Sequence, residues 1–166
     1  APSGLWLVFN ENGKGATYYA PQFVKSNEVT WDPVSEDHPM ERKGYEFGGW
    51  YTDEECTDSN KFAFGYPLTE ATTIYAKWTH KTTANYTVLI WKQNVAGDGY
   101  DFVESVTVQN AAVGTTPSAV TTTGNDAGRV TGANYTGETG FSFSRTDQAS
   151  KTVAPEGTTV VNVYWD

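Results

Sequence analysis

The fold of the first half of this 166-residue chain is decided by the stretch Gly44-Tyr45-Glu46-Phe47-Gly48-Gly49-Trp50-Tyr51-Thr52-Asp53. Its aromatic residues alternate with small or polar ones, which is typical of a strand with one buried face. The two glycines interrupt the alternation and predict a β-bulge or a close backbone approach. We therefore expect a core strand in which Tyr45, Phe47 and Trp50 are largely buried.

Further strands are predicted on both sides of this stretch. Residues 5–10 form a short apolar run, and the turn signal at 11–15 leads to a returning strand over 17–24. Residues 33–43 are polar and contain Pro39, so they predict a short helix or an irregular crossing. A brief strand is predicted over 61–66, and the alternation over 72–78 predicts a closing strand.

The polar, threonine-rich segment after residue 78 is the best linker candidate. We predict a first domain over residues 1–80, a linker over 81–85 and a second domain over 86–166. The second domain is expected to open with a hairpin whose strands are 86–92 and 100–108. Residues 111–132 are poor in apolar periodicity and predict a loop with at most one short helix. A strand is predicted over 158–165.

The two halves repeat one another weakly. The stretch Gly44-Tyr45-Glu46-Phe47 followed by Thr52-Asp53 is echoed by Gly140-Phe141-Ser142-Phe143 followed by Thr146-Asp147. Each half then ends on an aromatic strand. This order of elements favours an α+β, mostly β class, with two tandem small domains in which a crossing segment covers one face of a sheet, as in a β-grasp (ubiquitin-like) fold.

Composition excludes several classes of partner. The net charge is −9, and the eleven Lys and Arg residues do not cluster into the basic stripe that nucleic acid or an anionic membrane surface requires. No segment reaches transmembrane length, so we expect no direct membrane insertion. The single Cys56 excludes a disulfide within the chain, and its acidic neighbours disfavour a reactive thiolate. The abrupt ends suggest an excised piece of a longer protein.

The first half resembles a known repeat family. The residues that carry the resemblance span residues 5–79 and are Asn12-Gly13 after an apolar strand, the stretch from Gly44 to Asp53, and Ile74-Tyr75-Ala76-Lys77-Trp78. Together they resemble the Listeria–Bacteroides repeat, also called the internalin B-repeat. Lys14 stands where the usual pattern has a second glycine, and the segment before Gly44 is longer and more acidic than is typical.

The second half, residues 84–166, is similar to the mucin-binding-protein-like (MucBP-like) repeats of Gram-positive surface proteins. The similarity is carried by residues 86–92, Gly99-Tyr100, Gly140-Phe141 and 157–164. The two resemblances imply a β-grasp fold in both halves, an extracellular location on the cell wall or as a secreted protein, and neighbouring repeats in the same chain. They supply no catalytic residues, so we expect no enzyme activity and no cofactor.

The chain lacks a motif for catalysis or metal binding. His38 and His80 have no ligand spacing, and there is no Gly-x-Ser-x-Gly elbow. Loop carboxylates near Asp53, or Asp98 with Asp101, have the chemistry that calcium prefers but not the spacing of an EF-hand. We therefore predict that these are ordinary turns, with calcium as an alternative to be tested.

Two functions follow from these observations as expectations. The first is a non-catalytic tandem repeat segment of a bacterial surface or secreted protein, which acts as a stalk or spacer or as an adhesin module that contacts a host surface protein or a mucin-type glycan. The alternative is a glycan-binding accessory module of a secreted carbohydrate-active enzyme. For either kind of ligand the candidate residues are the aromatic side chains outside the clearest strands: Trp31, Tyr18, Tyr19 and Tyr66.

Overall fold

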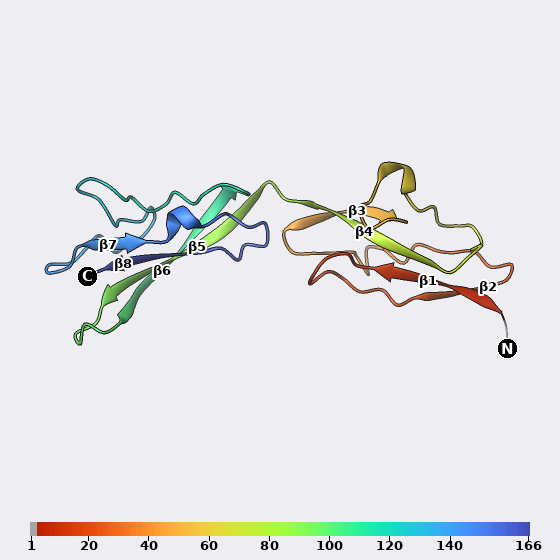
Figure 1. Cartoon of the computed structure of the whole chain (residues 1–166), viewed down its shortest axis with the longest axis horizontal. Coiled ribbons are helices and arrows are strands. Elements are labelled where there is room, and N and C mark those ends of the chain that lie inside the picture. Colours follow the sequence, from red (N-terminus) through yellow and green to blue (C-terminus); the bar gives the residue numbers. More distant parts are fainter. Residues whose placement is uncertain (1–2) are drawn as a thin grey trace. The chain divides into compact units, whose positions relative to one another are not determined.

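A computed structural model describes residues 3–166 and divides the chain into two compact units, one that ends at His80 and one that spans Lys81–Asp166. We call them unit 1 and unit 2. Each unit contains its own four-stranded sheet, drawn in Figure 1. The described residues include two 3-10 turns and no α-helix. The prediction of a mostly β chain is confirmed, whereas the helical part of the expected α+β class is absent from residues 3–166.

Unit 1 is built on a mixed sheet. Its strands are β1 (Gly4–Asn10), β2 (Gln22–Lys25), β3 (Tyr45–Tyr51) and β4 (Thr72–His80), in the spatial order β2-β1-β4-β3. The two central strands, β1 and β4, run parallel, and both outer strands pair antiparallel to their neighbours. The 3-10 turn η1 of this unit spans Asp58–Asn60.

Strand β3 contains the glycine pair that predicted a bulge. Its register against β4 shifts between Phe47 and Trp50, and Gly49 has a φ of 106°, a value that side chains disfavour. Beyond the bulge the side chain of Trp50 is 3 % exposed. Phe47 packs against the core but, like Tyr45, is only half-buried, so the expected burial is confirmed for Trp50 alone. The Arg42 guanidinium lies over the Tyr45 ring, 3.7 Å from its centroid.

One face of the unit 1 sheet carries the core. Leu7, Phe9 and Ile74 point to this face and are buried, as the two-residue period of a strand requires. The cover is irregular chain rather than a helix. It contributes the apolar side chains of Tyr19, Val34, Met40, Phe62, Phe64 and Leu68.

Unit 2 repeats the same strand order. Its strands are β5 (Thr83–Gln93), β6 (Tyr100–Ala112), β7 (Phe143–Thr146) and β8 (Val160–Trp165), arranged as β6-β5-β8-β7 with β5 and β8 parallel. The 3-10 turn η2 (Gln148–Ser150) follows β7. In both units a phenylalanine of the third strand lies opposite a tryptophan of the fourth: Phe47 opposite Trp78, and Phe143 opposite Trp165.

The core of unit 2 also lies on one face of its sheet. Val88, Ile90 and Val163 are fully buried there. The cover is the segment of residues 113–142, in which Val120 and Val130 form an isolated antiparallel bridge. The opposite face carries a row of aromatic rings, with Trp91 5.8 Å from Phe102 and Tyr100 4.8 Å from Tyr164.

Several predicted boundaries are wrong, for local reasons. The returning strand begins at Gln22 rather than at residue 17, because residues 16–21 fold over the core instead of pairing with β1. The brief strand over 61–66 is reduced to one bridge between Tyr51 and Lys61. Strands reach His80 and resume at Thr83, so the five-residue linker predicted over 81–85 is reduced to Lys81 and Thr82.

Candidate functional site

The structure separates the four aromatic residues that the sequence singled out. Tyr18 and Tyr66 are each 66 % exposed and Trp31 is 55 % exposed. Tyr19 is instead partly buried and packs against the core of unit 1, where its ring lies 6.2 Å from those of Phe9 and Trp50 and its hydroxyl donates to the His38 carbonyl. Tyr19 is therefore not part of an exposed platform, because the chain before β2 folds over the core.

Trp31 and Tyr66 lie on neighbouring segments of unit 1. The Thr30 amide donates to the Tyr66 carbonyl at 3.0 Å, and the Gly65 amide donates to the Thr30 carbonyl at 2.9 Å. Gln22, buried under this pair of segments, donates to the Trp31 carbonyl at 2.7 Å and accepts from the Trp31 amide at 3.3 Å. The backbone of Trp31 is thus fixed while its indole remains exposed.

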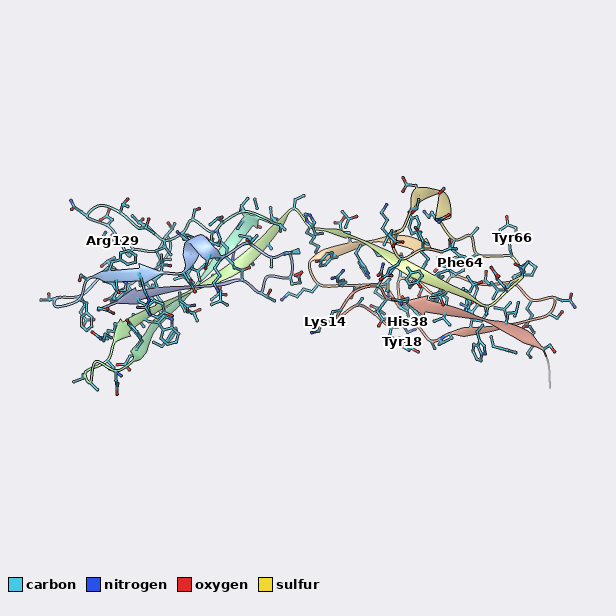
Figure 2. All side chains as sticks on the ribbon, in the orientation of Figure 1. Lys14, Tyr18, His38, Phe64, Tyr66 and Arg129 are labelled. Atoms are coloured by element: carbon cyan, nitrogen blue, oxygen red, sulfur yellow. The ribbon has the colours of Figure 1, made fainter. Side chains whose placement is uncertain are left out.

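Tyr18 is remote from that pair. Figure 2 shows Tyr18 and Tyr66 apart on unit 1. The neighbour of Tyr18, Thr17, is held by residue 41, since the Thr17 amide donates to the Glu41 carbonyl at 2.9 Å and the Glu41 amide donates to the Thr17 hydroxyl at 3.0 Å. The candidate set therefore reduces to three exposed rings: Trp31 and Tyr66, whose segments are joined by backbone hydrogen bonds, and Tyr18.

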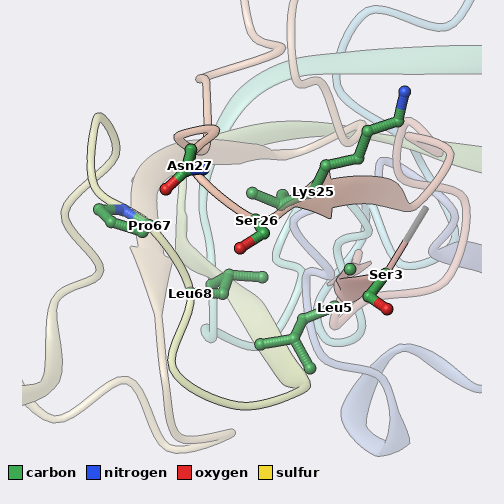
Figure 3. A pocket seen from close by; sticks show the side chains of 9 residues that line it. Ser3, Leu5, Lys25, Ser26, Asn27, Pro67 and Leu68 are labelled. Carbon is green, nitrogen blue, oxygen red and sulfur yellow. The ribbon is translucent and has the colours of Figure 1, made fainter.

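A pocket of about 450 Å³ lies at the end of the unit 1 sheet where β1 begins, as drawn in Figure 3. Its apolar floor consists of Leu5, Val24 and Leu68, and its rim includes Lys25 and Asn27. None of the four predicted aromatic residues lines it. Sequence reasoning missed this pocket because its walls come from three separate segments of unit 1 and the residues carry no shared motif.

The acidic loops considered for calcium form local turns. Asp53 accepts hydrogen bonds from the amide and the hydroxyl of Thr57. The bond from the hydroxyl is the main cause that lowers the pKa of this carboxyl below its usual value. Asp98 accepts from the Asn94 side chain at 2.9 Å. Within residues 3–166, no group of three or more His, Cys, Asp or Glu side chains is placed to hold a metal ion.

Cys56 is a buried thiol in unit 1. Its Sγ lies 3.5 Å from the Ala76 carbonyl oxygen. Burial raises the pKa of this thiol, and the negative charge of Asp53 raises it further. The acidic surroundings expected from the sequence are therefore present, and they act in the direction that disfavours the thiolate.

Comparison with known proteins gives one match. Residues 7–77 match the Listeria-Bacteroides repeat domain family, a stretch that runs from within β1 to within β4 and covers less than half of the chain. No curated protein and no solved structure matches the chain. The MucBP-like resemblance of unit 2 stays a prediction.

The matched family indicates the kind of protein in which a repeat like unit 1 occurs. No helix among the described residues is long and apolar enough to cross a membrane. The resemblance inferred for residues 5–79 is confirmed over nearly its whole length. Unit 1 therefore matches a repeat domain of a kind that is found in bacterial surface proteins.

Proposed function

We propose that the chain is a non-catalytic, load-bearing spacer of a bacterial surface or secreted protein, made of two β-grasp-like units in which irregular chain takes the place of the helix. The family match of unit 1 supports a repeat module outside the cell. The observation that carries the spacer role is the parallel pairing of the first and last strands within each unit.

Parallel pairing sets where the chain enters and leaves unit 1. Strand β1 pairs with β4 from Leu7 opposite Thr72 to Asn10 opposite Tyr75, and β4 continues to His80. At the rise of a β-strand, Gly4 and His80 are separated by about 35 Å along the strand direction. The chain therefore enters unit 1 at one end of its sheet and leaves at the other, as a spacer needs.

The same geometry determines how tension acts on each unit. A pull on the two chain ends slides β1 and β4 past each other, so the hydrogen bonds between them must break together rather than one by one. In unit 2 the equivalent ladder is longer, running from Thr87 opposite Val160 to Lys92 opposite Trp165. We therefore expect both units to resist tension and unit 2 to resist it more.

Single-molecule stretching of the whole chain tests this proposal. Two unfolding events are expected, and the event at the higher force should release the length of unit 2. Hydrogen bonds loaded together give a high barrier, and forced unfolding reports the rate over that barrier.

The matched control changes only the direction of the pull. Handles at Ser144→Cys and at the carboxyl terminus, in a Cys56→Ser background, would peel β7 from β8, because these strands pair antiparallel with Phe143 opposite Trp165. Unit 2 should then open at a markedly lower force. Equal forces in the two directions would contradict the spacer proposal.

A further inference from the structure

Unit 2 contains a pocket of about 490 Å³ at the end of β8. Three aromatic residues line it, Phe141, Phe143 and Trp165, and its polar rim includes Asn125, Arg129 and Glu138. Figure 2 marks Arg129 on this unit. A floor of aromatic rings with a few convergent polar groups is the usual composition of a small-molecule site.

Two buried polar atoms of unit 2 have no hydrogen-bond partner within residues 3–166: Nε1 of Trp165, a residue of the pocket lining, and the hydroxyl of Tyr135, which does not line the pocket. A third such atom, Nε1 of Trp50, lies in unit 1. The rings of Trp165 and Tyr135 pack edge to face, 5.4 Å apart. A buried donor without a partner loses the hydrogen bond that it makes to water in the unfolded chain, so two of them in one cluster call for an explanation. Burial raises the pKa of the Tyr135 hydroxyl, and the charge of Glu138 raises it further, so this hydroxyl keeps its proton.

The equivalent position in unit 1 is satisfied by the protein itself. Trp78, which stands opposite Phe47 as Trp165 stands opposite Phe143, donates from its Nε1 to the Glu11 carbonyl at 2.7 Å. The turn after β1 supplies that acceptor. In unit 2 the loop of residues 124–142 packs against the indole instead, so closely that a Cβ on Gly128 would lie 2.5 Å from Cζ2 of Trp165. The loop places backbone atoms against the indole ring, but none of them accepts a hydrogen bond from Nε1–H of Trp165.

The charges at the rim are already balanced. The Arg129 guanidinium lies 3.6 Å from the Asp126 carboxylate, and the Lys92 ammonium lies 3.1 Å from the Glu138 carboxylate. Lys92 also lies over the ring of Phe141, 5.5 Å from its centroid. Because each cation has its own anion, the rim favours an uncharged ligand that offers hydroxyl groups over an anionic or cationic one.

From these observations we propose that the pocket beside Trp165 binds an uncharged saccharide of one or two pyranose rings. The aliphatic face of a pyranose would stack on Phe141 and Phe143, and its hydroxyls would exchange hydrogen bonds with Asn125, Arg129 and Glu138. The Trp165 indole belongs to the lining, whereas its N–H and the Tyr135 hydroxyl are buried. The inference does not rest on the spacer function, since it concerns one end of unit 2 and requires no tension.

Titration of the whole chain with maltose, cellobiose, lactose and N,N′-diacetylchitobiose tests the proposal, with calorimetry and the indole N–H resonances as readouts. We expect at least one of these sugars to bind and to shift the Trp165 N–H resonance. Phe141→Ala and Arg129→Ala should each weaken binding by about tenfold, the effect of losing roughly one good contact.

The matched control is Phe102→Ala, which removes an exposed ring from the opposite face of the same sheet and should leave affinity unchanged. Circular dichroism and thermal unfolding establish that the variants are folded. The Arg129→Ala variant removes an exposed side chain, so it stays informative if Phe141→Ala does not fold.

Three outcomes would overturn the proposal. The first is that none of the four sugars binds at 20 mM, about the weakest affinity expected of so small a ligand. The second is binding that Trp31→Ala removes and that the pocket variants leave intact, which would place the ligand on unit 1. The third is that only a charged sugar such as sialyllactose binds. None of these outcomes bears on the unfolding forces, so the two proposals fail separately.

Discussion

Units 1 and 2 share a strand order but cover their sheets with unrelated chain. Both have parallel central strands and an outer strand on each side. In unit 1 the core face of the sheet is covered by residues 26–44 and parts of the other loops. In unit 2 it is covered by the longer segment 113–142. The comparison teaches that the paired strands determine where the core lies, whereas the cover needs only apolar side chains and a few fixed points.

In both units one of these fixed points is a buried glutamine whose side-chain amide pairs with the backbone of the covering segment. Gln22 binds both backbone groups of Trp31, and Gln148 accepts from the Val120 amide at 2.9 Å and donates to the Val120 carbonyl at 3.1 Å. Both glutamines are buried. A primary amide matches the donor and acceptor of one residue, so it can hold irregular chain against a sheet in place of a backbone partner.

The largest expected effect concerns the independence of the two cores. Ile74→Ala and Ile90→Ala each truncate a fully buried side chain and should destabilise by about 2–5 kcal/mol. Because each residue belongs to a separate core cluster, hydrogen exchange should accelerate in the mutated unit alone. If either substitution accelerated hydrogen exchange in both units, the two units would unfold as one cooperative body, and the prediction of independent cores would be wrong.

The next largest effect is the loss of stability when each of the two buried glutamines is replaced by leucine. Gln148→Leu should destabilise by about 1–3 kcal/mol for each backbone group that it leaves without a partner. Gln22→Leu should cost less, because its partner Trp31 is 55 % exposed and water can replace the amide, whereas Val120 is 4 % exposed. Urea denaturation of the whole chain measures both changes. The controls Gln22→Glu and Gln148→Glu lose the donor and bury a carboxylate against a backbone carbonyl, so at neutral pH each should destabilise at least as much as the leucine variant.

The smallest expected effect is a difference in stability between alanine substitutions of Asp53 and Asp147, two residues that the sequence repeat aligns. Asp147 accepts from the amide and the side chain of Asn162, at 2.7 and 3.0 Å, and so holds β8, whereas Asp53 closes only its own turn on Thr57. Asp147→Ala should therefore destabilise unit 2 by about 1 kcal/mol, and Asp53→Ala should affect unit 1 less. Thermal unfolding of the two variants checks the order, and a larger loss from Asp53→Ala would reverse it.

The Asp53 turn should also depend on pH. Since folding lowers the pKa of this carboxyl, its contribution is present above the ordinary pKa of about 4 and is lost as pH falls through the folded-state pKa. A carbon-detected NMR titration should place the Asp53 midpoint below that of an unstructured aspartate. A midpoint at or above the ordinary value would show that the Thr57 contacts do not persist in solution.

Much of the sheet was predictable, because apolar and polar residues alternate along a strand that has one buried face. The residues from Tyr45 to Tyr51 gave β3 and its bulge, and the hairpin of β5 and β6 was placed with only its ends extended. The cover was not predictable in the same way. Tyr19 packs against the core although its neighbours show no period, because a coil that folds over a sheet has no fixed repeat.

The candidate site was predicted less well than the sheet. Trp31, Tyr18 and Tyr66 are exposed, but the same reasoning also selected Tyr19, which packs against the core. The pocket at Trp165 was missed, since its rim lies in a glycine-rich stretch that has no motif. Strand β7 begins at Phe143, so Phe141 lies outside the strand and lines the pocket.

The irregular cover has a consequence for how such repeats can diverge. A helix must change by whole turns to keep its apolar face in place, but coil that is held at a few anchors can gain or lose single residues between them. Doubling the length of such a segment adds only about 0.6 kcal/mol of closure entropy. Descendants of one ancestral repeat can therefore accumulate insertions over the core face, and acquire new pockets there, while their strand pairing remains unchanged.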